Sequence, residues 1–329
     1  MILAGDIGGT NTRLAIFQDD GATIVRQQVF KNAGRTSFVD VAREFLAQQP
    51  GEKIDKAAFG VAGAVRGGVV NMTNLGWTLT DPDLERDLNI PNVALINDMV
   101  AHGENIDRLR ADQFVTLRQG QRCPDGGGAV IIAGTGLGEG GLYYDRATKR
   151  LRGLASEGGH CDFSPRDARE KRLLDFLRDH GKPTTWEAVI SGPGLRTIYD
   201  FLRGEGTHGP NTNAAADFGP AGPKPEQITQ SAVSGACPLC VETTRLFVSL
   251  YGAEAGNLAL KFCATAGLWL GGSIAESLLD LFRGDVFLDA FSAHGPSRIR
   301  EMLAKIPIHL IRFELNGLYG AANFAKGMT

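Results

Sequence analysis

The segment Gly5-Asp6-Ile7-Gly8-Gly9-Thr10 is a glycine-rich turn between two apolar stretches, residues 2–4 and residues 13–17. A second glycine-rich segment, residues 134–141, repeats this layout between two further apolar runs. Apolar runs of this length predict buried strands, so each turn is expected to close a β-hairpin. Glycine-rich turns let backbone N–H groups converge on an anion and can hold a phosphate. The repeated layout therefore predicts two related α/β halves.

Helical and strand patterns alternate along the rest of the chain. Helices are predicted at residues 38–46, 173–177 and 195–202 and from about 230 to 262, and buried parallel strands at residues 57–62 and 93–96. Strands that alternate with helices predict an α/β fold with mostly parallel sheets. Residues 207–229 are rich in Gly, Pro and Asn without a period, which predicts a long surface loop.

Length and composition exclude several classes of protein. The 329 residues suggest about two domains. The formal net charge of −3 gives no reason to expect nucleic acid or an anionic membrane as a partner. No run approaches the roughly 18 apolar residues of a membrane span, and Asp6 interrupts the place where a secretory leader would be apolar. The five cysteines, an odd number, argue against a disulfide framework and indicate a reducing cytoplasm.

Polar groups follow three of the predicted strands: Asp6, the pair Asn97–Asp98, and the turn at residues 134–136. Ligands of open α/β sheets bind beyond the carboxyl ends of the strands. One ligand could touch all three groups if two sheets face each other across a cleft. Taken alone, Asp98 fits a helix N-cap. Its functional alternative is a general base, next to an amide, Asn97, that can orient a hydroxyl.

Residues 156–163 place Glu157 and His160 around two glycines. The chain has no HExxH motif and no second His/Cys cluster with zinc spacing, which disfavours a metal site. Carboxylate and imidazole groups suit the vicinal hydroxyls of a carbohydrate. An ordinary polar turn remains an equal alternative for this segment.

Three short motifs point away from other functions. No GxxxxGK[ST] occurs, which excludes a P-loop NTPase. Residues 136–141 match GxGxxG, but residues 142–145 predict a strand where a dinucleotide-binding fold needs a helix, which disfavours a nicotinamide-dependent dehydrogenase. Cys237 and Cys240 form a bare CxxC without a partner pair and are expected to be small buried residues.

In this order, the clusters resemble the bacterial glucokinase family of the actin-like/hexokinase-like ATPase superfamily. The matching segments are residues 5–13, 95–98, 133–138, 156–160, 191–195 and 271–275, which span nearly the whole chain. The resemblance implies an α/β fold of two actin-like (ribonuclease H-like) domains that flank a deep cleft. The implied small domain consists of residues 1–108 plus 312–329, and the large domain of residues 109–311.

The resemblance also implies a role for each matched residue. Asp98 is similar to the family's catalytic base, which takes the proton from the 6-hydroxyl of the sugar as that hydroxyl attacks the γ-phosphate of ATP. Asp6 is similar to the acidic group that orients Mg²⁺ through water. The implied sugar-binding set is Asn74, Asn97, Asp98, Glu157, His160 and Glu187, and the implied nucleotide-binding set is Asp6, Gly8, Gly9, Thr10, Asn11, Thr135, Gly136, Gly271 and Gly272.

The implied activity is ATP-dependent phosphorylation of glucose to glucose 6-phosphate in the cytoplasm, with ATP and Mg²⁺ as cofactors and a homodimer as one assembly that the family adopts. Closure around the sugar would exclude water, with hinges expected near residues 105–112 and 308–314. The chain lacks the cysteine-rich zinc motif of the related repressor–kinase branch, so no structural zinc is expected. A kinase for fructose, mannose or an N-acetylhexosamine and a non-catalytic sugar sensor remain alternatives.

Overall fold

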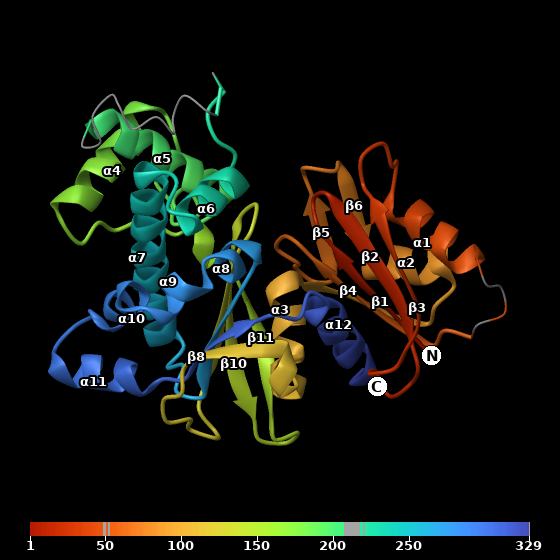
Figure 1. The fold of residues 1–329 in the computed structure, drawn as a ribbon. Coiled ribbons are helices and arrows are strands. Elements are labelled where there is room, and N and C mark those ends of the chain that lie inside the picture. Colours follow the sequence, from red (N-terminus) through yellow and green to blue (C-terminus); the bar gives the residue numbers. More distant parts are fainter. Residues whose placement is uncertain (49–50, 52, 207–217, 220, 329) are drawn as a thin grey trace. The chain divides into compact units, whose positions relative to one another are not determined.

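The computed structural model describes residues 1–48, 51, 53–206, 218–219 and 221–328. Internal contacts divide the chain into two compact units, whose elements are labelled in Figure 1. Unit 1 consists of Met1–Gln113, Gly140–Ser156 and Phe313–Thr329, and unit 2 of Phe114–Glu139 and Glu157–Arg312. Helices and strands alternate in both units, so the predicted α/β class is confirmed.

Unit 1 is built on a five-stranded sheet of order β3-β2-β1-β4-β7. Its centre is parallel, because β1 pairs with β4 and β4 with β7 in the same direction, whereas β1, β2 and β3 form an antiparallel meander. Helices α1 and α2 pack on one face of the sheet, and α3 and α12 on the other. The elements are β1 (Ile2–Ile7), β2 (Asn11–Phe17), β3 (Ile24–Lys31), α1 (Phe38–Ala47), β4 (Lys56–Val61), β5 (Val69–Met72), β6 (Trp77–Thr80), α2 (Asp81–Leu88), β7 (Asn92–Asn97), α3 (Asp98–Glu104), η1 (Ile106–Arg108), η2 (Ala111–Gln113) and α12 (Asn316–Lys326).

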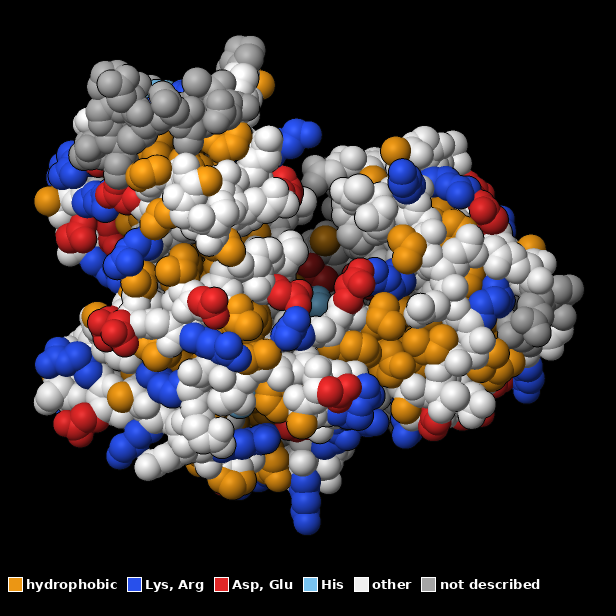
Figure 2. Space-filling model, viewed as in Figure 1, with side chains coloured by type: hydrophobic (Ala, Val, Ile, Leu, Met, Phe, Trp, Pro, Cys, Tyr) orange, Lys and Arg blue, Asp and Glu red, His pale blue; other side chains and the backbone are white. Residues whose placement is uncertain are grey.

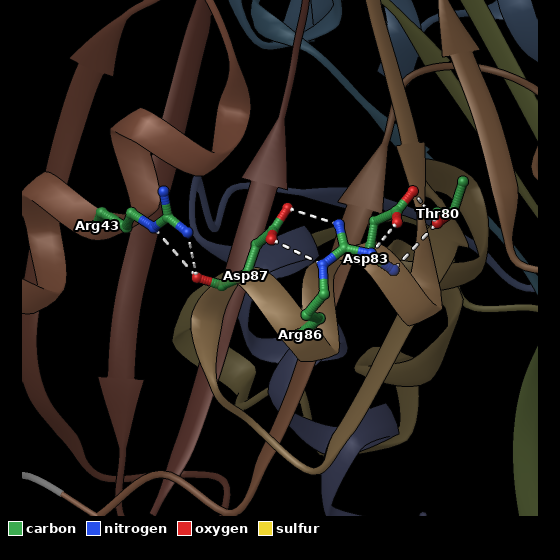
Figure 3. Close-up of polar contacts among 5 residues, drawn as sticks. All are labelled: Arg43, Thr80, Asp83, Arg86 and Asp87. Carbon is green, nitrogen blue, oxygen red and sulfur yellow. Dashed lines mark hydrogen bonds and ion pairs between the residues drawn. The ribbon is translucent and has the colours of Figure 1, made fainter.

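Polar contacts fix the start of α2 and fasten α2 to α1 (Figure 3). The hydroxyl of Thr80 accepts a hydrogen bond from the backbone N–H of Asp83 at 3.1 Å, as an N-cap residue does. Arg43 of α1 donates from Nε and Nη2 to the backbone carbonyl of Asp87 at 3.1 and 2.8 Å. These contacts hold the two helices over the same face of the sheet.

Unit 2 contains most of a six-stranded sheet of order β11-β10-β9-β12-β13-β8 and the helices whose apolar side chains form its core. Strand β12 is parallel to both β9 and β13, and β8 is antiparallel to β13. The elements that follow η2 are β8 (Phe114–Arg118), β9 (Gly128–Ala133), β10 (Leu137–Asp145), β11 (Arg150–Ser156), η3 (Gly158–His160), α4 (Ala168–Asp179), α5 (Gly192–Glu205), α6 (Pro225–Val233), α7 (Pro238–Lys261), β12 (Gly267–Gly271), α8 (Ser273–Ser277), α9 (Leu279–Arg283), α10 (Asp285–Ser292), α11 (Ser297–Lys305) and β13 (Ile308–Ile311).

Most of the predicted elements are confirmed, including helices α1, α4 and α5 and the parallel strands β4 and β7. Two predictions near residue 230 are wrong. The predicted loop at 207–229 ends early because α6 already begins at Pro225, and the predicted helix from about 230 to 262 is interrupted between α6 and α7. Both helices carry proline in their first turn, where its missing N–H costs no hydrogen bond. Residues 207–217 and 220 of the predicted loop lie outside the described residues.

Contacts with α3 group most of β10 and β11 with unit 1. Gly103 and Gly153 let α3 lie directly against β11, since a Cβ on Gly103 would lie 2.9 Å from the Cα of Gly153. Arg152 of β11 also donates to the buried carboxylate of Glu104 at 2.9 Å. The predicted bounds, 1–108 plus 312–329 and 109–311, assign this hairpin to the large domain, and the grouping by contacts differs from them there.

No helix in the described ranges is both long and apolar enough to cross a bilayer. On the face drawn in Figure 2, lysine and arginine side chains are interspersed with aspartate and glutamate.

Candidate active site

The ends of three parallel strands of unit 1 gather the predicted carboxylates at one edge of the sheet. Asp6 of β1 lies beside Gly60 of β4, and Gly60 lies beside Ile96 of β7. A Cβ on Gly60 would lie 3.7 Å from the carbonyl oxygen of Gly5 and 3.9 Å from the Cα of Asp98. The structure thus brings Asp6 and Asp98 together around Gly60, as the sheet rule predicts for this unit.

The alternation of side chains in β1 sets the direction of Asp6. Ile2 and Ala4 pack in the cluster that contains Ala101 of α3, whereas Leu3 and Ile7 pack in the opposite cluster with α1. Because side chains of a strand alternate between faces, Asp6 lies on the α3 side. The carboxylate therefore faces the helix that begins with Asp98.

His102 lies one helical turn after Asp98 and was not predicted from the sequence. Asn316 Nδ2 donates to His102 Nδ1 at 3.0 Å and to the His102 carbonyl at 3.1 Å. Burial lowers the pKa of His102 below its ordinary value, and the negative charge of Asp6 opposes this shift. A neutral imidazole therefore accompanies the two carboxylates.

Asn97, and not Asp98, is the N-cap of α3, which corrects the capping alternative for Asp98. The side-chain oxygen of buried Asn97 accepts from the backbone N–H of Met99 at 2.9 Å, and its Nδ2 donates to the carbonyl of Gly63 at 3.1 Å. Asp98 is the first helical residue, is half-buried, and accepts from the same Met99 N–H at 2.9 Å. Its carboxylate lies at a helix N-terminus, which favours negative charge.

The first glycine-rich turn is open at its tip and braced from behind. No atom lies within 4 Å of a Cβ placed on Gly9. The buried side chain of Asn32 donates to the carbonyl of Gly8 at 2.7 Å and accepts from the hydroxyl of Thr12 at 2.8 Å. Thr10 and Asn11 are exposed in the same turn. The backbone of this turn is therefore fixed while its surface remains free to receive an anion.

Asn74 lies apart from this turn, in the loop between β5 and β6, and its side chain is exposed. The described contacts of unit 1 place no other predicted site residue against it. Its assignment to the sugar-binding set stays a prediction.

The second glycine-rich turn, between β9 and β10, is also open at its tip. Nothing lies within 4 Å of a Cβ on Gly134, and Thr135 is exposed. The carbonyl of Gly134 accepts from the N–H of Gly192 at 2.8 Å, at the start of α5. Helix α5 thus supports this turn through a contact that could not be predicted from the sequence.

Glu187 joins the second turn to the predicted sugar-binding residues of unit 2. Its Oε2 accepts from the N–H of Leu137 at 2.9 Å, and its Oε1 lies 4.0 Å from His160 Nδ1. Glu157 immediately precedes η3, and its carbonyl accepts from the N–H of His160 at 3.0 Å. Gly159 lies directly against Leu137, where any side chain would clash. The structure therefore gathers Glu157, His160 and Glu187 in one cluster, in which Glu157 and His160 are exposed and Glu187 is half-buried.

Gly271 and Gly272 end β12 beside the second turn. Gly272 has φ +97°, and a Cβ there would clash with the carbonyl of Ala133, so this position requires glycine. The following helix, α8, lines a pocket of about 700 Å³ in unit 2. Its walls are Gly134, Thr135, Gly192, Pro193, Pro225, Glu226, Thr229, Gln230, Val233, Ser234, Ser273, Ile274 and Ser277.

Sequence patterns missed most of this pocket. Of its walls only Thr135 belongs to the predicted nucleotide-binding set, and α6 was predicted in part as a loop. The proline signals of residues 223 and 225, taken with Lys224 and Gln227, could have indicated a helix start.

Two other motifs have the structures that were expected for them. Residues 137–145 form strand β10, so the GxGxxG match does not open a helix and does not support a dinucleotide-binding fold. Cys237 and Cys240 are buried, and the Cys237 sulfur accepts from the Cys240 N–H at 3.1 Å as the N-cap of α7. Within the described residues, no group of three or more His, Cys, Asp or Glu side chains is arranged to hold a metal.

Comparisons with known proteins show the family and the fold of this chain. The sequence model of the family Glucokinase matches residues 3–328. A glucokinase of Nostoc sp. (strain PCC 7120 / SAG 25.82 / UTEX 2576) is 36% identical over 345 residues, which cover 98% of each protein. A glucokinase crystal structure from an Antarctic psychrotroph is 28% identical, has a TM-score of 0.81 and covers 99% of each chain.

A ROK family glucokinase from Streptomyces griseus, solved in complex with glucose and AMPPNP, is 22% identical with a TM-score of 0.65 and covers 99% of each chain. This likeness shows the fold alone. Together the matches confirm the expected actin-like α/β fold class and identify the protein as an enzyme that transfers a phosphoryl group. The chain belongs to the glucokinase family.

Proposed function

We propose that this enzyme transfers the γ-phosphoryl group of ATP to the 6-hydroxyl of glucose, with Asp98 as the general base. The observation that supports the proposal best is the position of Asp98 at the sheet edge, gathered with Asp6 around Gly60 and close to an open glycine-rich turn. Phosphoryl transfer depends on positioning and on neutralising charge more than on covalent chemistry. A carboxylate and a phosphate-binding turn on one rigid sheet edge meet that need.

Each of the two residues that follow β7 has a separate task. The amide of Asn97 is held by Met99 and Gly63, and its second N–H can donate to a sugar hydroxyl. Asp98 accepts the proton of the 6-hydroxyl as the new P–O bond forms, while the bond to the leaving ADP breaks. A positioned base of this kind contributes about 10²–10⁴-fold in rate.

Glu157, His160 and Glu187 bind the remaining sugar hydroxyls. Carboxylates accept hydrogen bonds from vicinal hydroxyls, and an imidazole can donate or accept. Glu187 is well suited because the N–H of Leu137 already fixes one of its oxygens at 2.9 Å, so little side-chain freedom is lost when sugar binds. Asn74 completes the proposed set.

The pocket of unit 2 is proposed as the adenosine site. It begins at the second turn, where Gly134 and Thr135 would lie beside phosphates, and it continues between α6 and α8. Its volume of about 700 Å³ falls in the range of about 300–1,000 Å³ that small-molecule sites occupy. Gly272 holds the backbone close to Ala133 at one side of this site, and Gly271 lies against Ile132.

The residues at the first turn fit a magnesium ion bound with ATP. Mg²⁺ keeps several waters and uses one or two carboxylates together with substrate phosphates. The half-buried carboxylate of Asp6, next to a turn with open space at Gly9, offers this combination. Bound there, the ion would neutralise charge on the phosphates, and Asp6 would hold its water ligands.

The proposal is tested by measuring ADP release from ATP with a panel of glucose, fructose, mannose and N-acetylglucosamine, and by locating the phosphate of the product by ³¹P NMR. Glucose turnover well above the other sugars, with phosphate on O6, is expected. A different preferred hexose would replace glucose in the proposal. If calorimetry detects glucose binding but no ADP forms, the protein is a sugar sensor and the proposed kinase activity is wrong.

The compartment and the assembly belong to the same proposal. All five cysteines are free, and a reducing cytoplasm would keep them so. A homodimer is proposed from the resemblance alone. Light scattering coupled to size-exclusion chromatography distinguishes a mass of one chain from a mass of two.

A further inference from the structure

Arg196 of α5 ties that helix to the segment that leads into α6. Its Nη1 donates to the carbonyl of Ala221 at 2.7 Å and to the carbonyl of Pro223 at 3.1 Å. Its Nε donates to Asp200, one turn further along α5, at 2.8 Å. One guanidinium group therefore holds two carbonyls of a loop while a carboxylate orients it.

Gly222 makes this tie close. It lies between the two carbonyls that Arg196 binds, has φ +70°, and a Cβ there would clash with the guanidinium. A residue with a side chain would strain the backbone and displace the arginine. Glycine at position 222 therefore leaves the space that the Arg196 side chain occupies.

The two ends of this tie both belong to the walls of the proposed adenosine pocket. Pro193, one turn before Arg196 in α5, lines one wall. Helix α6, which begins two residues after Pro223, supplies another wall with Thr229, Gln230 and Val233. The position of α6 relative to α5 sets the width of the pocket. Arg196 ties the segment before α6 to α5, beside the packing of buried Ile228 in the core.

We propose that Arg196 is a positioning residue that holds the α6 wall of the pocket and thereby sets the affinity for the nucleotide. The inference rests on the proposed assignment of this pocket to ATP. Arg196 itself does not line the pocket, so it acts through α6 and not by touching the ligand. Without it, the loop carbonyls turn to water and α6 loses its fixed distance from α5.

The test compares Arg196→Gln with Arg203→Gln. Arg203 lies on the same helix, pairs with Asp200 at 3.5 Å, and is half exposed, which makes it a matched control. Loss of the charged hydrogen bonds predicts that Arg196→Gln raises the KM for ATP and the Kd for AMPPNP about tenfold. The KM for glucose changes less than about twofold, since that site lies elsewhere. Arg203→Gln changes neither constant.

Amide hydrogen exchange gives a readout that does not depend on activity. The N–H groups of residues 228–234 are expected to exchange faster in Arg196→Gln than in the wild type, and those of α7 to remain protected. Arg196→Lys, which can still reach one carbonyl, is expected to fall between the two proteins. Gly222→Ala should reproduce the rise in KM for ATP with Arg196 present, and it serves as the second variant if Arg196→Gln fails to fold.

The outcomes separate this inference from the proposed function. If the wild type binds AMPPNP and both Arg196→Gln and Gly222→Ala bind it equally well, the positioning role is wrong and the kinase proposal stands. Equal rises in the KM for ATP and for glucose would show a general loss of structure and also refute the role. If the wild type binds no AMPPNP, the pocket assignment fails, and this inference with it.

Discussion

The two glycine-rich turns share an open tip but differ in what lies next to them. A Cβ on Gly9 or on Gly134 would meet no atom within 4 Å, so either turn has room for phosphate oxygens. Beside the first turn, the ends of β1 and β7 place Asp6 and Asp98 around Gly60. Beside the second turn lie the ligand pocket and the carboxylate of Glu187. An open turn shows where an anion can bind. The side chains beside the turn indicate whether that part of the site carries out the reaction or binds the substrates.

The sharpest test of this comparison is Asp98→Ala. If the residues beside the first turn carry out the chemistry, kcat for ADP release falls about 10²–10⁴-fold while the KM for ATP changes little. Asp87→Asn changes a half-buried carboxylate of α2 in the same unit (Figure 3), and this control should retain full activity. Near wild-type turnover by Asp98→Ala would remove the base from the mechanism.

Glu139 follows the second glycine-rich turn, and it tests whether a carboxyl group buried there is charged, as Asp6 and Asp98 beside the first turn are proposed to be. Burial, and then the negative charge of Glu254, raise the pKa of Glu139 to about 8, and both of its oxygens lack hydrogen-bond partners in the described chain. The folded protein then keeps a proton that the unfolded chain loses above its ordinary pKa. Stability is therefore lost as pH rises from about 4.5 to about 8 and is constant above that.

Glu139→Gln cannot ionise, so its unfolding free energy should exceed that of the wild type by a margin that grows across this pH window to on the order of 3 kcal/mol. Urea unfolding at pH 5, 6, 7, 8 and 9 measures the margin. Glu301→Gln, at an exposed position of α11, should show no such growth. A margin that stays flat across the series would mean that Glu139 is ionised in the folded protein.

Asn32→Ala removes the brace of the first turn. The carbonyl of Gly8 and the buried hydroxyl of Thr12 lose their partner, which predicts a loss of about 1–3 kcal/mol in unfolding free energy. Since the turn is proposed to hold phosphates, the KM for ATP should rise as well. Asn71→Ala, which removes an exposed hydrogen bond to Thr78, is the control. Similar losses of unfolding free energy in both variants would mean that Asn32 does not specifically stabilise the turn.

His160→Ala is expected to have the smallest effect of these substitutions. It tests whether the residues beside the second turn bind the sugar. Its ring is 62% exposed and lies 4.0 Å from Glu187, so its removal should perturb the fold little. The KM for glucose is expected to rise about tenfold, as for the loss of one good hydrogen bond, with kcat and the KM for ATP nearly unchanged. His180→Ala, exposed after α4, should behave as wild type. A fall in kcat alone would place chemistry beside the second turn.

Local patterns predicted the elements best where one rule dominated. The short apolar runs of β1 and β7 predict buried strands. The alternation of side chains along a strand then places Asp6 on the α3 side of the sheet. The rule that ligands bind beyond parallel strand ends then singled out Asp6 and Asp98 as groups that one ligand could touch. Proline misled the prediction at α6, because at the first helical position it begins a helix and does not break one.

The sequence by itself determined the α/β class, the two glycine-rich turns and most of the residues proposed to act, because turn geometry and strand periodicity are properties of a few consecutive residues. Only the tertiary structure decided that Asn32 braces the first turn, that α5 supports the second, and that Arg196 reaches Ala221 and Pro223. These contacts join residues that are 24 or more positions apart, and no local spacing encodes such a pairing. The packing of distant elements decides whether a polar side chain has a hydrogen-bond partner, and Glu139 has none among the residues that the structure describes.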